Sequence, residues 1–561
     1  MSGKTEPLEP SAPHETPAPA ARTGAAGRHS LLVGAGILAS RIAGLVRDRV
    51  LAAYFGTGLH ADVFSAGLRL PNLLQNLLGE GTLSASFIPV YSELLGRGRY
   101  DEAGRVAGAV FALLVAIAGL VSLLGIAFAP LLVTIFTPGF EGERRELMIA
   151  VTRILFPMTG VLVLSAWALG VLNSHRRFFV PYFAPVLWNA AIIGSFVLFG
   201  TRLNLDGLLI AVACGALLGG LLQLGVQLPW VLRLERRLRI GIRRNEPSFR
   251  EVVKNAVPAV LGRGVVQLGG YADMLLASLL AVGAVARLRF AQTLYLLPIS
   301  LFGMSVAAAA LPDLARQREA HADAMRANVS AAARRVAFYV VPSFTAFVLL
   351  GDTFVAGLFE TGEFGEADVA IVWMTLAAYS IGLLASTTSR VYQSAFFALR
   401  DTRTPARIAG VRVAVSVLAG LLAMLQLERI SIGGVPLPGG ALADWTVQGL
   451  PLGPVGLALG SALGAWVEWG VLVRRLRRRI GHVGAGGGAI ARMLAAALAA
   501  AAAGHAARIP LDGVHPFVAA LGVALAFGIV YFGVARWLGI AEAREAVGAL
   551  RRRLRARQST R

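Results

Sequence analysis

Residues 104–136 read GRVAGAVFALLVAIAGLVSLLGIAFAPLLVTIF, and no charged side chain occurs from residue 106 to residue 136. About 20 apolar residues are enough for a helix to cross a hydrocarbon core roughly 30 Å thick. Comparable stretches recur from near residue 30 to residue 538, and the chain is 56% hydrophobic with a mean hydropathy of +0.66. A water-soluble fold could not bury so much apolar surface. We therefore predict an all-α polytopic membrane protein of about fourteen transmembrane helices.

The predicted helices form two series along the chain. The first series covers residues 30–54, 61–79, 104–136, 147–173, 181–200, 206–233 and 252–281. The second series covers residues 290–313, 331–358, 367–399, 404–426, 452–473, 487–508 and 515–538.

A loose internal duplication accompanies the two series. The pair Leu73-Leu74 recurs as Leu296-Leu297, and the cations near residue 176 that precede Pro181 recur near residue 400 before Pro405. Because the repeat covers an even number of spans, both halves should keep the same orientation and pack as two lobes around a central cavity. Chance matches in so apolar a chain are the alternative explanation.

These features divide the chain into parts. Residues 1–28, rich in Pro, Ala, Glu and Thr, are predicted to be a disordered cytoplasmic tail. Helices 1 to 6 form an N-lobe at 29–233, a basic cytoplasmic linker covers 234–251, and helices 7 to 12 form a C-lobe at 252–480. Helices 13 and 14 occupy 481–540, and 541–561 is a basic cytoplasmic tail.

The positive charges are distributed unevenly between the two sides of the predicted spans. Most of the 53 Lys and Arg residues fall in the tails and in the even-numbered connections, in clusters such as Arg474–Arg479. Because cytoplasmic loops carry the excess of Lys and Arg, both termini are predicted to face the cytoplasm. This topology and anionic membrane lipids explain the net charge of +21, so we do not expect nucleic acid as a partner.

Several charged residues lie inside predicted spans, where an unpaired charge costs at least about 2.5–3.5 kcal/mol. Arg41 and Arg47 lie in the first helix, Asp62 begins the second, and Arg69 follows two helical turns later on the same face. We expect these four residues to cluster around a wet, cationic cavity that suits an anionic substrate. Interior ion pairs, or snorkelling of Arg47 to the membrane interface, are the alternative interpretations.

The seventh helix adds Arg263 and Asp273, which lie ten residues apart and could face the cavity at different depths. Asp273 is also a candidate site for a coupling cation. The polar residues show no catalytic grouping of His, Ser and Asp, no phosphate-binding Gly-Lys-Ser/Thr loop and no metal-ligand spacing. We therefore expect neither an enzyme nor a cofactor or metal.

Three neighbouring motifs are more specific than the charge pattern. They are Ser40-Arg41-Ile42-Ala43-Gly44-Leu45-Val46-Arg47-Asp48, Pro71-Asn72-Leu73-Leu74, and Gly79-Glu80-Gly81 followed by Phe87-Ile88-Pro89-Val90. Weaker matches follow from Asn173 to Pro185, at Asp273 and from Asp401 to Pro405. Together they resemble the MurJ (MviN) family of lipid II flippases, in the multidrug/oligosaccharidyl-lipid/polysaccharide (MOP) exporter superfamily, over nearly the whole chain after the tail.

The resemblance implies two six-helix lobes around a V-shaped cavity, with helices 13 and 14 forming a groove for a lipid tail. It implies that Arg41 and Arg47 contact the pyrophosphate of lipid II, the undecaprenyl-pyrophosphate-linked muropeptide, and that Asp62 stabilises or gates the site. Arginine suits this role because it makes charge-assisted hydrogen bonds to phosphate oxygens. Lipid II would cross the bacterial inner membrane by alternating access, and other cell-wall synthesis proteins are candidate partners.

The sequence departs from the family pattern at two positions. Gln75 and Thr293 stand where the family carries Arg, and Arg263, Arg287 and Arg289 are candidates to replace the missing charge. The eleventh helix also lacks the Asn or Asp of sodium-binding members, which argues against sodium coupling. The departures keep two alternatives open beside a lipid II flippase. These are a related transporter of another lipid-linked saccharide or small molecule, and a scaffold paralogue that transports nothing.

Overall fold

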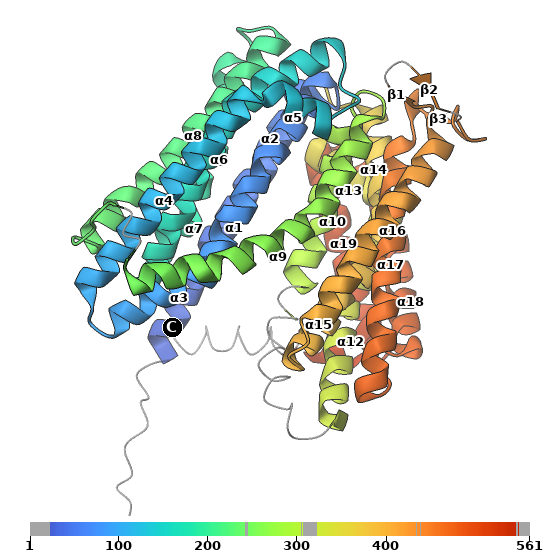
Figure 1. The fold of residues 1–561 in the computed structure, drawn as a ribbon. Helices are drawn as coiled ribbons and strands as arrows, with labels where there is room; N and C mark the ends of the chain where they lie inside the picture. Colours follow the sequence, from blue (N-terminus) through green and yellow to red (C-terminus); the bar gives the residue numbers. More distant parts are fainter. Residues whose placement is uncertain are drawn as a thin grey trace, which may run out of the picture.

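The computed structural model describes residues 23–241, 245–303, 306, 322–432, 435–437, 439–545 and 548. In these residues the chain is almost entirely helical, and the helices form two groups that lie beside one another (Figure 1). The predicted all-α class is confirmed.

The first group, the N-lobe, is built from six long helices and two short ones. The long helices are α1 (Thr23–Phe55), α2 (Leu59–Leu78), α4 (Tyr100–Ala127), α6 (Gly142–Ser174), α7 (Phe179–Phe199) and α8 (Leu205–Leu234). The short helices are α3 (Glu80–Gly96) and α5 (Ala129–Phe136). Because α1 begins at Thr23, the last residues of the expected tail are helical.

The second group, the C-lobe, follows the long helix α9 (Pro247–Ser278), which runs from beside α3 to beside α16 (Figure 1). The C-lobe contains α10 (Ala284–Pro298), the π-helix η1 (Ile299–Gly303), α12 (Ala322–Leu349), α13 (Gly351–Phe359), α14 (Glu366–Ile381), α15 (Leu383–Ala398), α16 (Arg403–Leu427) and α17 (Gly453–Ile480). Two small hairpins, β1 (Ser431–Ile432) with β2 (Val435–Pro436) and β3 (Thr446–Val447) with β4 (Leu450–Pro451), join α16 to α17.

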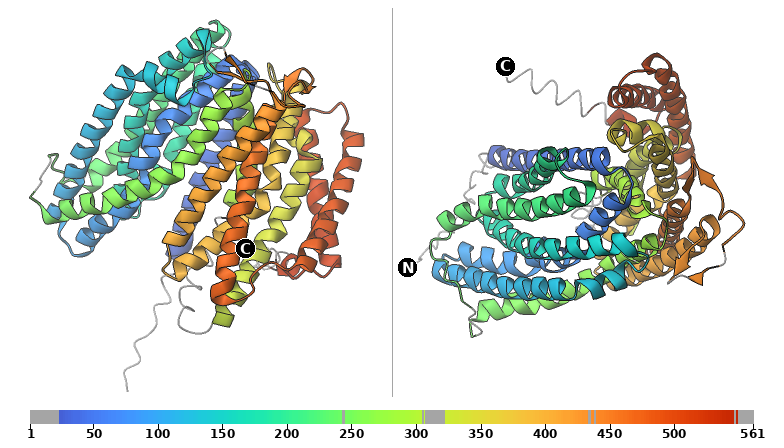
Figure 2. Two further views of the ribbon diagram at one scale, coloured as in Figure 1. Left: turned by 45° about the vertical axis from the view of Figure 1, so that its right-hand side comes forward. Right: turned by 90° about the horizontal axis from the view of Figure 1, so that it is seen from above.

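The last two helices, α18 (Gly487–Arg508) and α19 (Pro516–Trp537), are linked by the short 3-10 helix η2 (Ile509–Leu511). They pack on each other and on α12 and α13. Figure 2 shows this pair on the outer side of the C-lobe, away from the N-lobe.

Three predicted helices are interrupted in the structure. The span predicted at 104–136 breaks at Phe128 between α4 and α5, where Pro130 lacks the amide hydrogen that would continue the helix. The span at 331–358 divides at Leu350, and the span at 367–399 bends by 40° at Gly382. The prediction missed α3, whose buried side chains include Phe87 and Tyr91.

The internal duplication is visible in two matching turns. Arg176 after α6 and Arg400 after α15 both adopt left-handed backbone angles, with φ of 58° and 59°. In each turn the following residue donates its N–H to the carbonyl five positions earlier, at 2.8 and 2.9 Å. This geometry satisfies carbonyl groups at a helix end. The same turn therefore ends a corresponding helix in each lobe.

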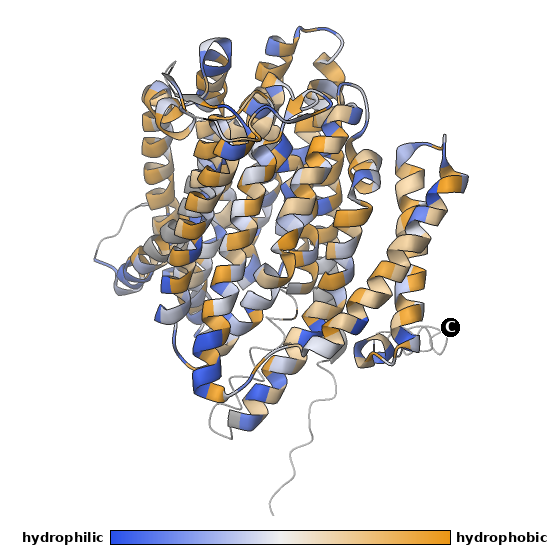
Figure 3. Ribbon diagram, turned by 90° about the vertical axis from the view of Figure 1, so that its right-hand side faces the viewer, coloured by the Kyte–Doolittle hydropathy of each residue, from blue (hydrophilic) through white to orange (hydrophobic). Residues whose placement is uncertain are grey.

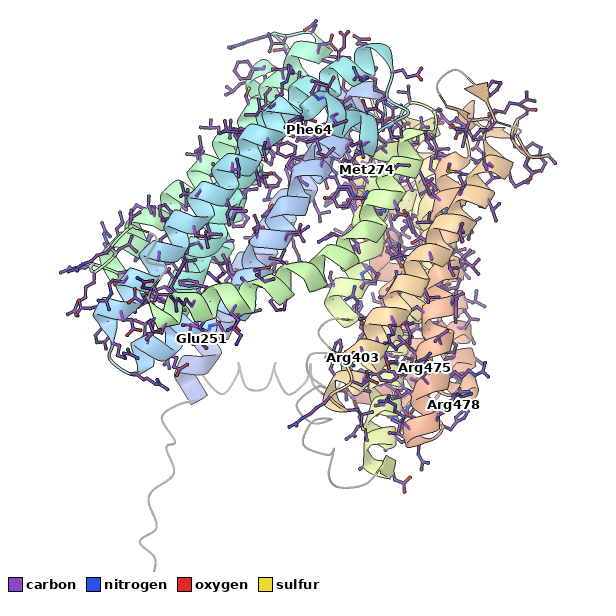
Figure 4. The ribbon with its side chains drawn as sticks, viewed as in Figure 1. Phe64, Glu251, Met274, Arg403, Arg475 and Arg478 are labelled. Carbon is purple, nitrogen blue, oxygen red and sulfur yellow. The ribbon has the colours of Figure 1, made fainter. Side chains whose placement is uncertain are left out.

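The largest hydrophobic core joins the two lobes at one end of the molecule. It contains Phe64 of α2, Met274 of α9 and Phe290 of α10, and Figure 4 shows the first two near the upper end. We call this upper end the closed end. A second core lies within the N-lobe around Trp167, and a third packs α18 and α19 on α12 around Tyr531.

The outer surface of the helices is apolar. Leu123, Ile529 and Trp537 are 67%, 72% and 83% exposed. In Figure 3 hydrophobic residues follow the middle of the helices, and hydrophilic residues gather towards both helix ends and in the loops. A contiguous apolar surface of this kind fits a lipid environment.

Within the described residues, nine helices are long and apolar enough to cross a membrane, or ten if the bent pair α14–α15 counts as one span. The predicted number of about fourteen spans is therefore not confirmed. Helices α1, α2, α9 and α10 are not among the nine. These helices supply most of the charged residues at the contacts between the lobes.

Candidate functional site

Asp62 lies in the first turn of α2 and is fully buried. Its carboxylate accepts the backbone N–H groups of Gly283 at 2.7 Å and Ala286 at 2.8 Å, at the beginning of α10 in the C-lobe. It also pairs with Arg144 of α6, whose side chain is almost fully buried. The first N–H groups of a helix lack partners within the helix and carry partial positive charge. Asp62 therefore joins the N-lobe to the N-terminus of a C-lobe helix.

Arg49 of α1 makes the opposite contact. Its guanidinium donates to the carbonyl oxygens of Gly357 at 2.8 Å and Leu358 at 3.0 Å, in the last turn of α13. A helix C-terminus has unpaired carbonyls and partial negative charge, so a cation stabilises it. Nearby, the hydroxyl of Thr57 donates a hydrogen bond to Asp368 of α14. We call these bonds of Arg49, Thr57 and Asp62 to the C-lobe the closed-end contact.

A second group of charges surrounds Asp48 of α1. Arg47 donates to Asp48 Oδ1 from Nε at 3.1 Å and from Nη2 at 2.9 Å. Arg289 of α10 donates to the same oxygen at 2.6 Å and to the hydroxyl of Ser65 at 3.2 Å. The guanidinium of Arg47 also lies 5.2 Å from the ring centre of Trp188. One carboxylate is therefore shared by two arginines that come from different lobes.

Arg69 of α2 is close enough to interact electrostatically with Arg289 and with Asp273 of α9. Its backbone carbonyl accepts the hydroxyl of Tyr271 at 2.9 Å. We call Arg47, Arg69, Arg289 and Asp48 the inter-lobe arginine cluster. It holds three cations and one carboxylate, so it has an excess of positive charge and suits an anion such as a diphosphate.

Asp273, the candidate cation site, has a second cationic neighbour in Arg412 of α16, which also pairs with Glu468 at 2.7 Å. Two arginines thus already act on this carboxylate. The described residues hold no group of three or more His, Cys, Asp or Glu side chains that could bind a metal. Cation binding at Asp273 stays a prediction.

The four residues expected to cluster are divided in the structure. Arg47 and Arg69 lie in the inter-lobe arginine cluster, whereas Asp62 is engaged with Arg144 at the closed end. Arg41 donates to the hydroxyl of Ser300 in η1 at 2.7 Å, which is a further contact between the lobes. The side chain of Arg263 lies outside the described residues.

Several members of these sites are not among the residues predicted from the sequence: Asp48, Arg144 and, at the closed end, Arg49, Thr57 and Asp368. Asp48 follows Arg47 directly, so its proximity could have been noticed. Arg144 precedes the predicted span 147–173, so the sequence places it in a connection between helices. Of the candidates to replace missing charge, Arg289 joins the cluster, while Arg287 donates from Nε to Thr57 at 3.1 Å and lies at the closed end.

An apolar groove of about 450 Å³ lies between the C-lobe and α19. Its lining comes from α10, η1, α12, α13 and α19 and includes Leu297, Phe302, Tyr339, Phe527 and Phe532. Apolar, largely preformed grooves are typical of sites for hydrophobic ligands.

A family model described as lipid II flippase MurJ matches residues 51–434. The chain belongs to the lipid II flippase MurJ family. A lipid II flippase MurJ of Burkholderia cenocepacia is 31% identical over 462 residues, which cover 81% of this chain and 84% of that protein. A probable lipid II flippase MurJ of Rhizobium tropici is 32% identical over 422 residues, which cover 74% of this chain and 78% of that protein.

Solved structures of MOP exporters share the fold. A lipid II flippase MurJ in an inward closed conformation has a TM-score of 0.72 at 21% identity, over 91% of this chain and 99% of that chain. An inward-facing multidrug resistance MATE transporter of the MOP superfamily has a TM-score of 0.61 at 19% identity. The match covers 78% of this chain and 94% of that chain. The two-lobed MurJ fold expected from the sequence motifs is thus present.

Proposed function

We propose that the protein flips lipid II from the cytoplasmic to the outer leaflet of a bacterial inner membrane, without making or breaking a bond. Membership of the lipid II flippase MurJ family is the main support. The inter-lobe arginine cluster is the single structural observation that carries the proposal. It brings three cations from both lobes together, and two of them, Arg47 and Arg289, share the Asp48 carboxylate at a position that a pyrophosphate could also occupy.

The charge distribution supports one orientation of the protein in the membrane. Figure 4 places Arg403, Arg475 and Arg478 at the lower end of the C-lobe, opposite the closed end. The excess of cations marks the cytoplasmic side. We therefore assign the lower end and both termini to the cytoplasm, and the closed end to the outer face.

Alternating access then requires the closed-end contact to break. The head group would enter from the cytoplasmic end and be held by Arg47, Arg69 and Arg289, while the lipid tail would occupy the groove beside α19. Opening at the outer face would separate Asp62 from the N-terminus of α10 and Arg49 from the C-terminus of α13. Each of these bonds joins a charged side chain to backbone groups of the other lobe, so it breaks when the lobes move apart and needs no change in protonation state.

The test is complementation of a bacterial strain depleted of its own lipid II flippase, together with lipid II translocation in reconstituted vesicles. The full chain should restore growth and translocation. Arg289→Ala removes a charge-assisted hydrogen bond and should lower the translocation rate by about 10- to 100-fold. Arg492→Ala, an exposed arginine on α18, is the matched control and should be active. Failure of the wild-type chain in both assays would reject the proposal.

A further inference from the structure

A second cavity, separate from the inter-lobe arginine cluster, lies wholly within the N-lobe. Its volume is about 450 Å³, within the size range of small-molecule sites. It lies among the end of α2, the beginning of α3, and α6, α7 and α8. We call it the N-lobe pocket, and its polar lining comprises Gln75, Asn76, Glu80, Ser84, Ser165 and Gln223.

Four of these side chains are available for a ligand. Ser165 is already engaged, because Gln223 and Gln227 donate to its hydroxyl at 3.0 and 2.7 Å. In contrast, the side chains of Gln75, Asn76, Glu80 and Ser84 make no hydrogen bond or ion pair to another residue that the structure describes. The N-lobe pocket therefore presents two carboxamides, one hydroxyl and one carboxylate.

The other side chains that line the pocket are apolar and belong to Leu162, Ala166, Leu169, Pro181 and Pro185. Among the side chains that the structure describes, no Arg or Lys lines the N-lobe pocket. A phosphate would lack a counter-charge there and would be repelled by Glu80. The chemistry instead fits an uncharged group that offers hydroxyl and amide donors and acceptors beside apolar carbon–hydrogen faces.

Two helices connect the N-lobe pocket to the inter-lobe arginine cluster. On α2, Asn76 follows Arg69 by seven residues, so both lie on one face about 10 Å apart along the axis. On α7, Pro185 lies three residues before Trp188, whose ring is 5.2 Å from the Arg47 guanidinium. This spacing is about one turn on the same face. The N-lobe pocket thus lies one to two turns from the cations.

We propose that the N-lobe pocket binds the N-acetylated sugar portion of the head group while the arginine cluster holds the diphosphate. The inference rests on the proposed flippase function and deepens it. In this arrangement Gln75 provides a neutral sugar contact at a position where the family pattern has Arg. The amides and the hydroxyl of the pocket bind sugar acetamido and hydroxyl groups, and Glu80 accepts from hydroxyl donors.

The test compares equilibrium binding of three lipids to the purified full chain in nanodiscs. The probes are lipid II, an undecaprenyl-pyrophosphate-linked N-acetylglucosamine without peptide, and undecaprenyl pyrophosphate without sugar. Wild type should bind the two sugar-bearing lipids more tightly than the bare diphosphate. The double variant Asn76→Ala/Ser84→Ala loses two hydrogen bonds and should bind both sugar lipids about tenfold more weakly, with unchanged affinity for undecaprenyl pyrophosphate. Glu80→Gln should show the same selectivity with a smaller loss.

The controls are Ser195→Ala, whose hydroxyl donates to the Ala191 carbonyl within α7, and the exposed Glu366→Gln of α14. Both should bind all three lipids as wild type does, and thermal unfolding should show that every variant is folded. Equal weakening of all three lipids, or no weakening, would overturn the sugar assignment. Weakening of lipid II alone would assign the pocket to the peptide and also overturn it. A wild-type chain that binds none of the lipids would reject the flippase proposal itself.

Discussion

At the scale of single residues, Asp62 shows how a buried charge is made tolerable. An isolated carboxylate in a membrane interior is costly, but Asp62 has the Arg144 guanidinium and two backbone N–H groups as partners. Removing one partner of a buried pair leaves the other charge without compensation. The stability of the closed end should therefore depend on both members of this pair.

Asp62→Ala should lower the free energy of unfolding by about 3–5 kcal/mol, because Arg144 stays buried without its carboxylate. Chemical unfolding in detergent measures this loss. Asp352→Ala, which removes a partly exposed pair with Arg508, is the matched control and should cost less than about 1 kcal/mol. The double variant Asp62→Leu/Arg144→Leu should recover most of the stability yet flip lipid II poorly. Wild-type stability in Asp62→Ala would contradict the role of the pair.

At the scale of helices, α16 and α17 of the C-lobe approach each other closely. A Cβ atom placed on Gly460 of α17 would lie 2.2 Å from the backbone nitrogen of Gly420 on α16. One placed on Gly464 would lie 2.0 Å from Ser416 Oγ. Small residues at every fourth position allow helix backbones to approach closely in a membrane. This glycine stripe sets the distance between the two helices.

Gly460→Ala should therefore separate α16 from α17 and destabilise the protein by about 1–3 kcal/mol. Gly470→Ala lies on the same helix with no heavy atom within 4 Å of the added Cβ, so it should be neutral or slightly stabilising. Thermal unfolding of both variants in the same detergent measures the difference. Equal unfolding temperatures would show that the close approach is not required.

At the scale of the whole molecule, charged side chains of the N-lobe hold the lobes together by binding helix ends of the C-lobe that carry the opposite partial charge. The N-lobe supplies an anion, Asp62, to the N-terminus of α10 and a cation, Arg49, to the C-terminus of α13. The backbone N–H of Glu363 adds a bond of 3.0 Å to the carbonyl of Ala53. Movement of the lobes would break these contacts as one set, which is a suitable basis for two discrete states.

A disulfide across the closed-end contact should stop transport. Thr57→Cys/Asp368→Cys in a Cys214→Ser background places two thiols where a hydrogen bond now joins the lobes. Oxidation should abolish lipid II translocation in vesicles, and a reductant should restore it, because the lobes can then separate. The pair Asp352→Cys/Arg508→Cys joins α13 to α18 without linking the lobes and should leave transport active. Full transport through the oxidised Thr57–Asp368 pair would contradict alternating access at this end.

The helical architecture could be predicted because lipid permits few solutions. Every backbone polar group in the hydrocarbon must be paired within the protein, so an apolar stretch such as residues 104–136 has to be helical. The motifs from Ser40 to Val90 were equally informative, because they predicted the family and the two-lobed fold. Helix α3 was missed because its burial depends on neighbouring helices and its sequence is not uniformly apolar.

The amino-acid sequence alone predicts the all-helical membrane fold, the duplication and the presence of charges in the first helices. Which of these charges meet depends on how the helices pack. Arg289 reaches Asp48 across 241 residues of sequence, and Asp62 binds backbone N–H groups that every residue type except proline possesses. Local sequence carries no signal for such partners, because they are chosen by how the two lobes pack.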